Sequence, residues 1–161
     1  MDLALVTGIV TAVTRAPAVI RYVLVVEDEQ NIRDVLAELF DVDGTVTTAA
    51  ATLAEAKAAL TSARFDLILT DLRLGGHRDG GLQVMAASAL LSPDATVVVL
   101  TAFPDDDYRH ASERLGATHF LEKPVPLQTI AALAARAGVA TAMRPAPRAP
   151  YAFTADASPI A

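Results

Sequence analysis

The sequence predicts a doubly wound α/β domain, with five parallel strands in one sheet and helices on both of its faces. Two observations carry this prediction. Five short β-like runs alternate with five helical patterns between positions 21 and 140, and such strict alternation is typical of a parallel sheet joined by crossover helices. Three of the runs are nearly all apolar, as expected for strands that are covered on both faces.

The five β-like runs span residues 22–26, 45–49, 65–70, 96–101 and 118–122. The first, third and fourth (YVLVV, FDLILT and TVVVLT) are the apolar ones, and we expect them at the centre of the sheet. The second and fifth (TVTTA and THFLE) contain more polar residues. These two runs are therefore expected nearer the edges.

Between the runs, apolar residues recur at the spacing of an amphipathic helix, and we expect these positions to face the core. Gly44 and Gly116 follow helical patterns, where a left-handed cap is favoured. Three aspartates at 105–107 open a helix, where negative charge meets the positive end of the dipole. The apolar stripes are Ile32, Val35, Leu36, Leu39 and Phe40; Leu53, Ala56 and Leu60; Leu82, Met85, Ala86, Ala89 and Leu90; Tyr108, Ala111 and Leu115; and Leu127, Ile130, Ala131 and Ala134.

The chain has 161 residues, enough for one domain with a full core, and we assign this domain to residues 21–140. Residues 1–20 are expected to be an apolar N-terminal extension that is either loosely ordered or an extra edge strand. Asp2 and Arg15 argue against a signal peptide, and the extension falls short of the about 20 apolar residues that cross a bilayer. Residues 141–161 contain four prolines and are expected to form a flexible tail. Because no helix-turn-helix pattern follows position 138, direct DNA binding is not expected.

Composition argues against several functions. A net charge of −6 leaves no basic stripe for non-specific nucleic-acid binding. The absence of cysteine excludes disulfides, thiol catalysis and thiolate zinc sites. It also fits a reducing compartment, and we expect a cytoplasmic protein with no membrane association. His77, His110 and His119 lack the spacing of metal ligands and are not expected to bind a metal.

Polar side chains follow four of the predicted strands at the end where parallel sheets bind ligands. Taken singly, each has an ordinary explanation: the acids after the first strand can start a helix, an aspartate can cap a turn, and a lysine before proline can end a loop. Taken together, they would meet at one edge of the sheet. They are Glu27, Asp28 and Glu29 after the first strand, Asp71 after the third, Thr101 at the end of the fourth and Lys123 after the fifth.

Clustered carboxylates repel one another unless a cation lies among them. An all-oxygen site of this kind suits Mg²⁺, which also coordinates phosphate oxygens. One aspartate could then attack a phosphoryl group and form an acyl phosphate, while a lysine and a hydroxyl neutralise charge on the transferring oxygens. The sequence therefore predicts a Mg²⁺-dependent phosphoryl-transfer site.

The chain resembles the receiver domain of two-component response regulators over roughly residues 21–138, in the motifs VLVVEDE, DLILTDLRL, VVVLTA and GATHFLEKP. The resemblance implies that Asp71 is the phosphoacceptor and that Mg²⁺ is bound by Glu27, Asp28, Asp71 and the main-chain carbonyl of Arg73. It implies catalytic roles for Thr101 and Lys123 beside Asp71. Thr101 and Phe120 would also be the two switch residues.

The same resemblance implies a stand-alone, CheY-like phosphorelay switch of flavodoxin-like fold. A histidine kinase or phosphotransfer protein would phosphorylate Asp71, and an unknown downstream protein would read the change. The switch would be a monomer or a weak phosphorylation-dependent dimer, and no enzyme beyond its own phosphotransfer and dephosphorylation. The alternatives are a phosphorylation-independent adaptor, a Mg²⁺-dependent aspartyl-phosphate phosphatase and, less favoured, a flavin-binding module.

Two segments depart from the family pattern, and two further residue pairs lead to local predictions. The loop LGGHRDGGL after Asp71 is glycine-rich and about two residues longer than usual, and Lys123-Pro124 continues as Val-Pro rather than with an aromatic residue. Arg109 and Glu113 have the spacing of a surface helix pair. Arg73 and Phe103 each lie two residues beyond a site residue, and we expect them to crowd the route of water to an acyl phosphate.

Overall fold

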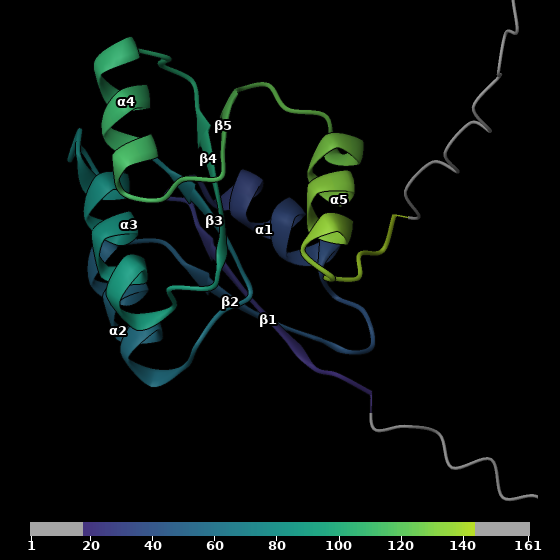
Figure 1. Ribbon diagram of the computed structural model, residues 1–161. Helices are drawn as coiled ribbons and strands as arrows, with labels where there is room; N and C mark the ends of the chain where they lie inside the picture. The colour runs from purple at the N-terminus through teal and green to yellow at the C-terminus, as the bar shows by residue number, and fades with distance from the viewer. Residues whose placement is uncertain (1–17, 144–161) are drawn as a thin grey trace, which may run out of the picture.

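The computed structural model of the chain describes residues 18–143, and these residues form one five-stranded parallel sheet. The strands pair in the order β2-β1-β3-β4-β5, so the two polar runs lie at the edges, as predicted (Figure 1). Residues 1–17 of the predicted extension and residues 144–161 of the predicted tail lie outside the described residues. The strands are β1 (Arg21–Val26), β2 (Thr45–Ala50), β3 (Leu67–Asp71), β4 (Thr96–Thr101) and β5 (His119–Glu122).

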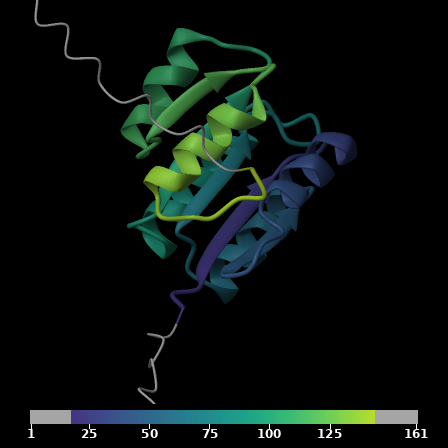
Figure 2. The ribbon, with the colours of Figure 1, turned by 90° about the vertical axis from the view of Figure 1, so that its right-hand side faces the viewer.

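Five helices alternate with the strands and cover both faces of the sheet, which confirms the predicted fold class (Figures 1 and 2). Helices α1 and α5 lie on one face, and α2, α3 and α4 lie on the other. None of the helices in this described region is long and apolar enough to cross a bilayer. The helices are α1 (Gln30–Leu39), α2 (Leu53–Ser62), α3 (Gly80–Leu91), α4 (Asp106–Arg114) and α5 (Leu127–Arg136).

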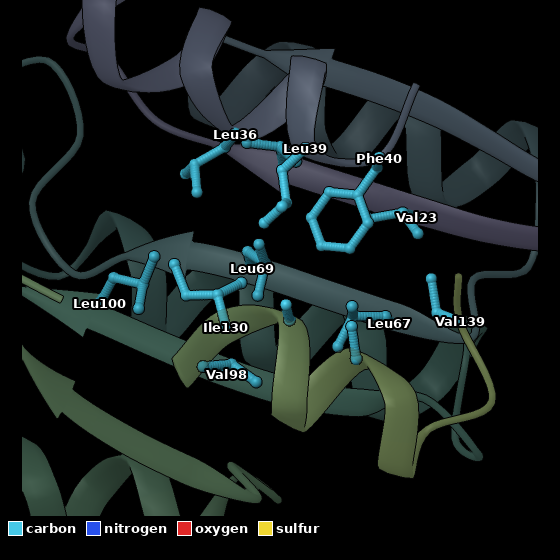
Figure 3. Close-up of a cluster of buried hydrophobic side chains, with 13 residues drawn as sticks. Val23, Leu36, Leu39, Phe40, Leu67, Leu69, Val98, Leu100, Ile130 and Val139 are labelled. Carbon is cyan, nitrogen blue, oxygen red and sulfur yellow. The ribbon is translucent and has the colours of Figure 1, made fainter. Parts of the chain in front are cut away.

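The hydrophobic core is divided into two layers by the sheet, because successive strand side chains point to opposite faces. Val23 and Val25 of β1 pack under α1 and α5, whereas Leu24 and Val26 pack under the other three helices. Figure 3 shows the first layer, in which Phe40 lies over β1 and β3. The central strands are almost fully buried, which explains their apolar sequences.

The predicted core stripe of α3 is wrong for three of its positions. Ala86, Ala89 and Leu90 are exposed, Leu90 by 83%, and the buried stripe instead contains Gly81, Val84, Met85 and Ser88. The reason is close contact with β3: a Cβ atom added at Gly81 would lie 2.2 Å from the Asp71 main-chain oxygen. The glycine therefore sets the rotation of α3, and the larger side chains on the opposite surface stay exposed.

The remaining stripes are buried or half-buried as predicted, with the exception of Val35, which is 45% exposed beside α5. The expected helix ends are also confirmed. Gly44 and Gly116 have φ angles of +84° and +90°, which only glycine adopts without strain. The Asp105 carboxylate accepts hydrogen bonds from two main-chain amides in the first turn of α4.

After α5 the chain crosses back to the C-terminal end of α1. Val139 is buried, and the Ala142 amide donates a hydrogen bond of 2.8 Å to the Leu39 carbonyl. Met143 packs against the same core layer as α1 and α5. The described part of the chain therefore ends beside α1.

Candidate functional site

The ends of four strands bring the site residues together at the carboxyl edge of the sheet. Glu27 follows β1, Asp71 ends β3, Thr101 ends β4 and Lys123 follows β5. Because β1, β3, β4 and β5 are consecutive neighbours in the sheet, residues up to 96 positions apart become adjacent. The expected gathering at one edge is therefore present in the structure.

Lys123 bridges two of the acids. Its Nζ atom lies 2.6 Å from Glu27 Oε2 and 2.7 Å from Asp71 Oδ2. All three side chains are largely inaccessible to solvent: Glu27 is 2% exposed, Asp71 11% and Lys123 16%. Lys123 is therefore paired twice, and removing it would leave two largely buried carboxylates without their partner.

Burial and pairing shift two pKa values in this cluster. Burial raises the pKa of Glu27 above its usual 4.5, and the hydrogen bond and charge of Lys123 only partly offset this effect. Burial acts to lower the pKa of Lys123, but its hydrogen bonds and ion pairs with Asp71 and Glu27 outweigh burial and raise that pKa above 10.5. Lys123 therefore remains a cation at neutral pH.

A third acid completes the cluster and leaves it with excess negative charge. Carboxylate oxygens of Glu27, Asp28 and Asp71 all lie within 4.8 Å of one another. One lysine cannot neutralise three carboxylates, and oxygen-only donors are those that hard divalent cations prefer. The cluster thus fits a magnesium-type ion. In the described part of the chain it is the only such group of potential ligands, and the three histidines lie outside it.

The glycine-rich loop after β3 helps to hold the acids in place. Gly75 and Gly76 adopt left-handed conformations in a tight turn closed by two main-chain hydrogen bonds between Leu74 and His77. This turn directs the Gly75 amide to Asp28, whose Oδ2 accepts its hydrogen bond at 3.0 Å. The longer loop is therefore part of the site rather than a remote insertion.

Sequence reasoning missed two of the groups that support the acids. The Arg33 guanidinium donates to the main-chain carbonyls of Glu27 (2.8 Å) and Asp28 (3.2 Å), and so fixes the loop between β1 and α1. The Gly75 amide is the second. The position of Arg33, six residues after Glu27, was the available signal for the first. No sequence pattern predicts the second, because the bond joins positions 47 apart.

Thr101 and Phe120 lie on the neighbouring strands β4 and β5. Thr101 is fully buried, and its Oγ1 accepts a hydrogen bond of 3.1 Å from the Phe103 amide. Phe120 is half-buried, and the Arg109 guanidinium of α4 lies 4.5 Å from its ring centroid. The predicted Arg109–Glu113 ion pair is absent among residues 18–143, since Arg109 packs on Phe120 instead.

Arg73 and Phe103 cover the other side of the site. The Arg73 guanidinium lies 3.8 Å from the Phe103 ring centroid, in a cation–π contact. The Arg73 amide donates to Asp71 Oδ1 at 3.1 Å, so the same residue contacts the central carboxylate through its main chain. This pair, Thr101 and Tyr108 are among the residues that line a crevice of about 330 Å³.

The fold and the site define a doubly wound parallel α/β domain with an acidic, lysine-bridged cluster at the carboxyl edge of its sheet. Residues 23–135 match the family described as the response regulator receiver domain. The chain therefore belongs to this family, which confirms the resemblance seen in the sequence. Receiver domains are phosphotransfer switches of two-component systems that interact with histidine kinases or phosphotransfer proteins.

Individual relatives agree with this assignment. Sporulation initiation phosphotransferase F of Bacillus subtilis is 30% identical over 67% of this chain and 86% of its own length. A response regulator from Burkholderia pseudomallei, solved with a phosphorylated aspartic acid, a calcium ion and citrate, gives a TM-score of 0.64 at 30% identity, covering 71% of this chain and 65% of that one. Chemotaxis protein CheY4 of Vibrio cholerae gives 0.65 at 25% identity, covering 73% and 98%. The chain spans less than half of several other curated regulators.

Proposed function

We propose that this receiver accepts a phosphoryl group on Asp71 from a histidine kinase or phosphotransfer protein and signals through a phosphorylation-dependent change in its protein contacts. The observation that carries the proposal is the position of Asp71, whose carboxylate is paired with Lys123 and lies within 4.8 Å of the carboxylates of Glu27 and Asp28. The cytoplasm, which is compatible with the cysteine-free composition, is the proposed location.

In the proposed reaction, a carboxylate oxygen of Asp71 attacks the phosphorus atom of a phosphohistidine. A P–O bond forms, the P–N bond breaks, and the leaving imidazole takes a proton. The bound Mg²⁺ ion would supply positive charge to the phosphoryl oxygens. Glu27, Asp28, Asp71 and the Arg73 carbonyl would hold that ion, and the Lys123 ammonium would neutralise a further phosphoryl oxygen.

The switch is proposed to start at Thr101. A phosphoryl group on Asp71 would offer its Oγ1 a new hydrogen-bond acceptor and draw the side chain away from the Phe103 amide. Phe120 would then turn inward and leave its contact with Arg109. Because Arg109 belongs to α4, this movement would change the surface that α4 and β5 present to a partner. The oligomeric state of the phosphorylated chain would tell whether that partner is a second copy or another protein.

The phosphatase alternative lacks a general acid for the leaving group. A phosphatase of this kind would need a second aspartate two residues after Asp71 as the general acid. Arg73 occupies that position, and its guanidinium is stacked on Phe103. The adaptor alternative requires that the intact cluster serve no phosphotransfer. Turnover of a phosphate ester would support the first alternative, and a chain that cannot be labelled would support the second.

The direct test is labelling by a small phosphodonor such as acetyl phosphate, followed by intact-mass spectrometry. The donor should add one phosphoryl group when Mg²⁺ is present and none when EDTA has removed the Mg²⁺. Asp71→Asn should abolish labelling, whereas the matched control Asp79→Asn, an exposed residue of the nearby loop, should retain it. Unchanged labelling of the Asp71→Asn protein would refute the assignment.

A further inference from the structure

An apolar groove of about 650 Å³ lies between α1 and α5, on the side of the sheet away from α3 and α4. We call it the α1–α5 groove. Its floor is Leu100, and it reaches Lys123 and Pro124 at the rim of the phosphoacceptor site. Its walls are aliphatic, formed by Ile32, Val35 and Leu36 of α1 and by Val125, Leu127 and Ile130 at the start of α5.

The groove exposes apolar side chains of α1 that the sequence pattern of this helix predicts to lie in the core. Val35 belongs to the apolar stripe of that helix, yet it is 45% exposed, whereas Leu36 and Leu39 are 3% exposed. Ile32, Val125 and Leu127 are only partly buried. A contiguous apolar patch of this kind is typical of a surface that another segment covers.

The chain itself supplies a segment within reach. The Ala142 amide is hydrogen-bonded to the Leu39 carbonyl, so the described part of the chain ends beside the C-terminal end of α1. From Leu39 to Asn31, at the far end of the groove, α1 rises by about 12 Å. Eight residues of extended chain, from 143 to Tyr151, span about 25 Å. Eighteen residues follow Met143, so the segment is long enough to line the whole groove.

The composition of that segment matches the groove. Residues 144–153 read RPAPRAPYAF, with two arginines, no acid, and Tyr151 and Phe153 as the large apolar side chains. Helix α1 also carries two exposed acids, Asp34 and Glu38, which are not part of the groove lining. Three prolines restrict the free segment, and this lowers the conformational entropy lost on binding.

We propose that residues 144–153 occupy the α1–α5 groove of the same molecule, with the rings of Tyr151 and Phe153 against its aliphatic walls. The bound segment covers the side of the groove that ends at Lys123 and Pro124. One consequence rests on the proposed function: the bound segment would cover part of the surface that a protein phosphodonor contacts near Lys123. A small donor does not need that surface.

The test is methyl NMR on the full chain, unphosphorylated and without Mg²⁺, so that its result is independent of phosphotransfer. We expect nuclear Overhauser contacts between the aromatic rings at 151 and 153 and the methyl groups of Val35 and Leu127. Tyr151→Ala with Phe153→Ala should remove these contacts and shift the methyl resonances. The control pair Thr154→Ala with Ser158→Ala, just after that segment, should leave them unchanged.

A second arm changes the groove rather than the segment. Val35→Glu should abolish the ring–methyl contacts to Leu127, whereas Val46→Glu, at a valine with the matched exposure of 43% on β2, should preserve them. Wild-type contacts that are missing, or that survive Val35→Glu, would overturn the proposal. Contacts that fade on dilution would also overturn it, because they would belong to the segment of a second copy.

Discussion

Replacing Asp28 by Asn should stabilise the protein without Mg²⁺ and destabilise it relative to wild type when Mg²⁺ is abundant. The substitution removes one negative charge from the cluster. The amide oxygen of Asn can still accept the Gly75 hydrogen bond that Asp28 Oδ2 accepts at 3.0 Å. The change therefore isolates electrostatic repulsion from hydrogen bonding.

The magnitude follows from the separation of the charges. Oxygens of the three carboxylates lie within 4.8 Å, where a like-charge pair costs about 1 kcal/mol in water and about 3.5 kcal/mol at an effective dielectric constant of 20. The Lys123 ammonium offsets one of the two repulsions that Asp28 experiences. Because Asp28 is exposed, the aqueous end of the range applies, and we expect the unfolding free energy to rise by about 1 kcal/mol.

Urea unfolding followed by circular dichroism, in EDTA at low ionic strength, measures this change. Asp34→Asn, at an exposed acid of α1 outside the cluster, is the control and should shift the unfolding free energy by less than about 0.5 kcal/mol. In Mg²⁺ at a hundred times its dissociation constant, the wild type should gain about 2.7 kcal/mol. The Asp28→Asn variant should gain much less, so the order of stability reverses. A variant that is less stable than wild type in EDTA, or that gains as much from Mg²⁺, would refute the reasoning.

Three further predictions concern the surroundings of the cluster. Replacing Arg73 and Phe103 together by Ala should shorten the lifetime of the acyl phosphate about two- to fivefold. This factor corresponds to the free energy of an exposed cation–π contact, about 0.5–1 kcal/mol. An unchanged decay rate of the labelled protein would contradict the prediction. Burial raises the pKa of Glu27, so binding of its proton stabilises the metal-free fold fully below pH 4.5, and this stabilisation is lost as the pH rises through the folded-state pKa. In urea titrations, Glu27→Gln should therefore become more stable relative to wild type between acid and neutral pH. Parallel pH profiles of the two proteins would argue against this prediction. Gly81→Ala should destabilise the fold by more than about 3 kcal/mol, because its Cβ would lie 2.2 Å from a main-chain oxygen. Gly80→Ala should cost less, because its Cβ would meet side-chain atoms of Leu74, the nearest at 2.9 Å. Equal losses of the two variants in thermal unfolding would contradict this order.

Much of the fold could be predicted because the relevant signals are local. The apolar runs at β1, β3 and β4 reflect burial on both faces, and the polar runs reflect an edge position. Each acid of the cluster lies at the end of a strand or within two residues after it, so its place at the carboxyl edge follows from strand direction alone. For this reason the gathering of Glu27, Asp71 and Lys123 was accessible from the sequence.

Other features depend on contacts between distant segments and were missed. The apolar pattern of α3 points to Leu90, but the helix is rotated because Gly81 alone allows its close approach to β3. Arg109 has a potential partner one turn away in Glu113, yet it packs on Phe120 from another element. A local sequence pattern cannot predict which of two possible contacts forms, because the distance between residues of different elements is set only when the sheet and helices pack together.

The sequence by itself determined the order of strands and helices, the central and edge positions, and the identities of the acids, hydroxyl and lysine that follow the strands. It could do so because hydrophobic periodicity and strand ends are properties of neighbouring residues. Only the tertiary structure decided how those groups are held: the double ion pair of Lys123, the Gly75 and Arg33 hydrogen bonds to the acidic loop, and the open groove between α1 and α5. These depend on side chains and amides whose separations arise from packing, and packing is a property of the whole domain.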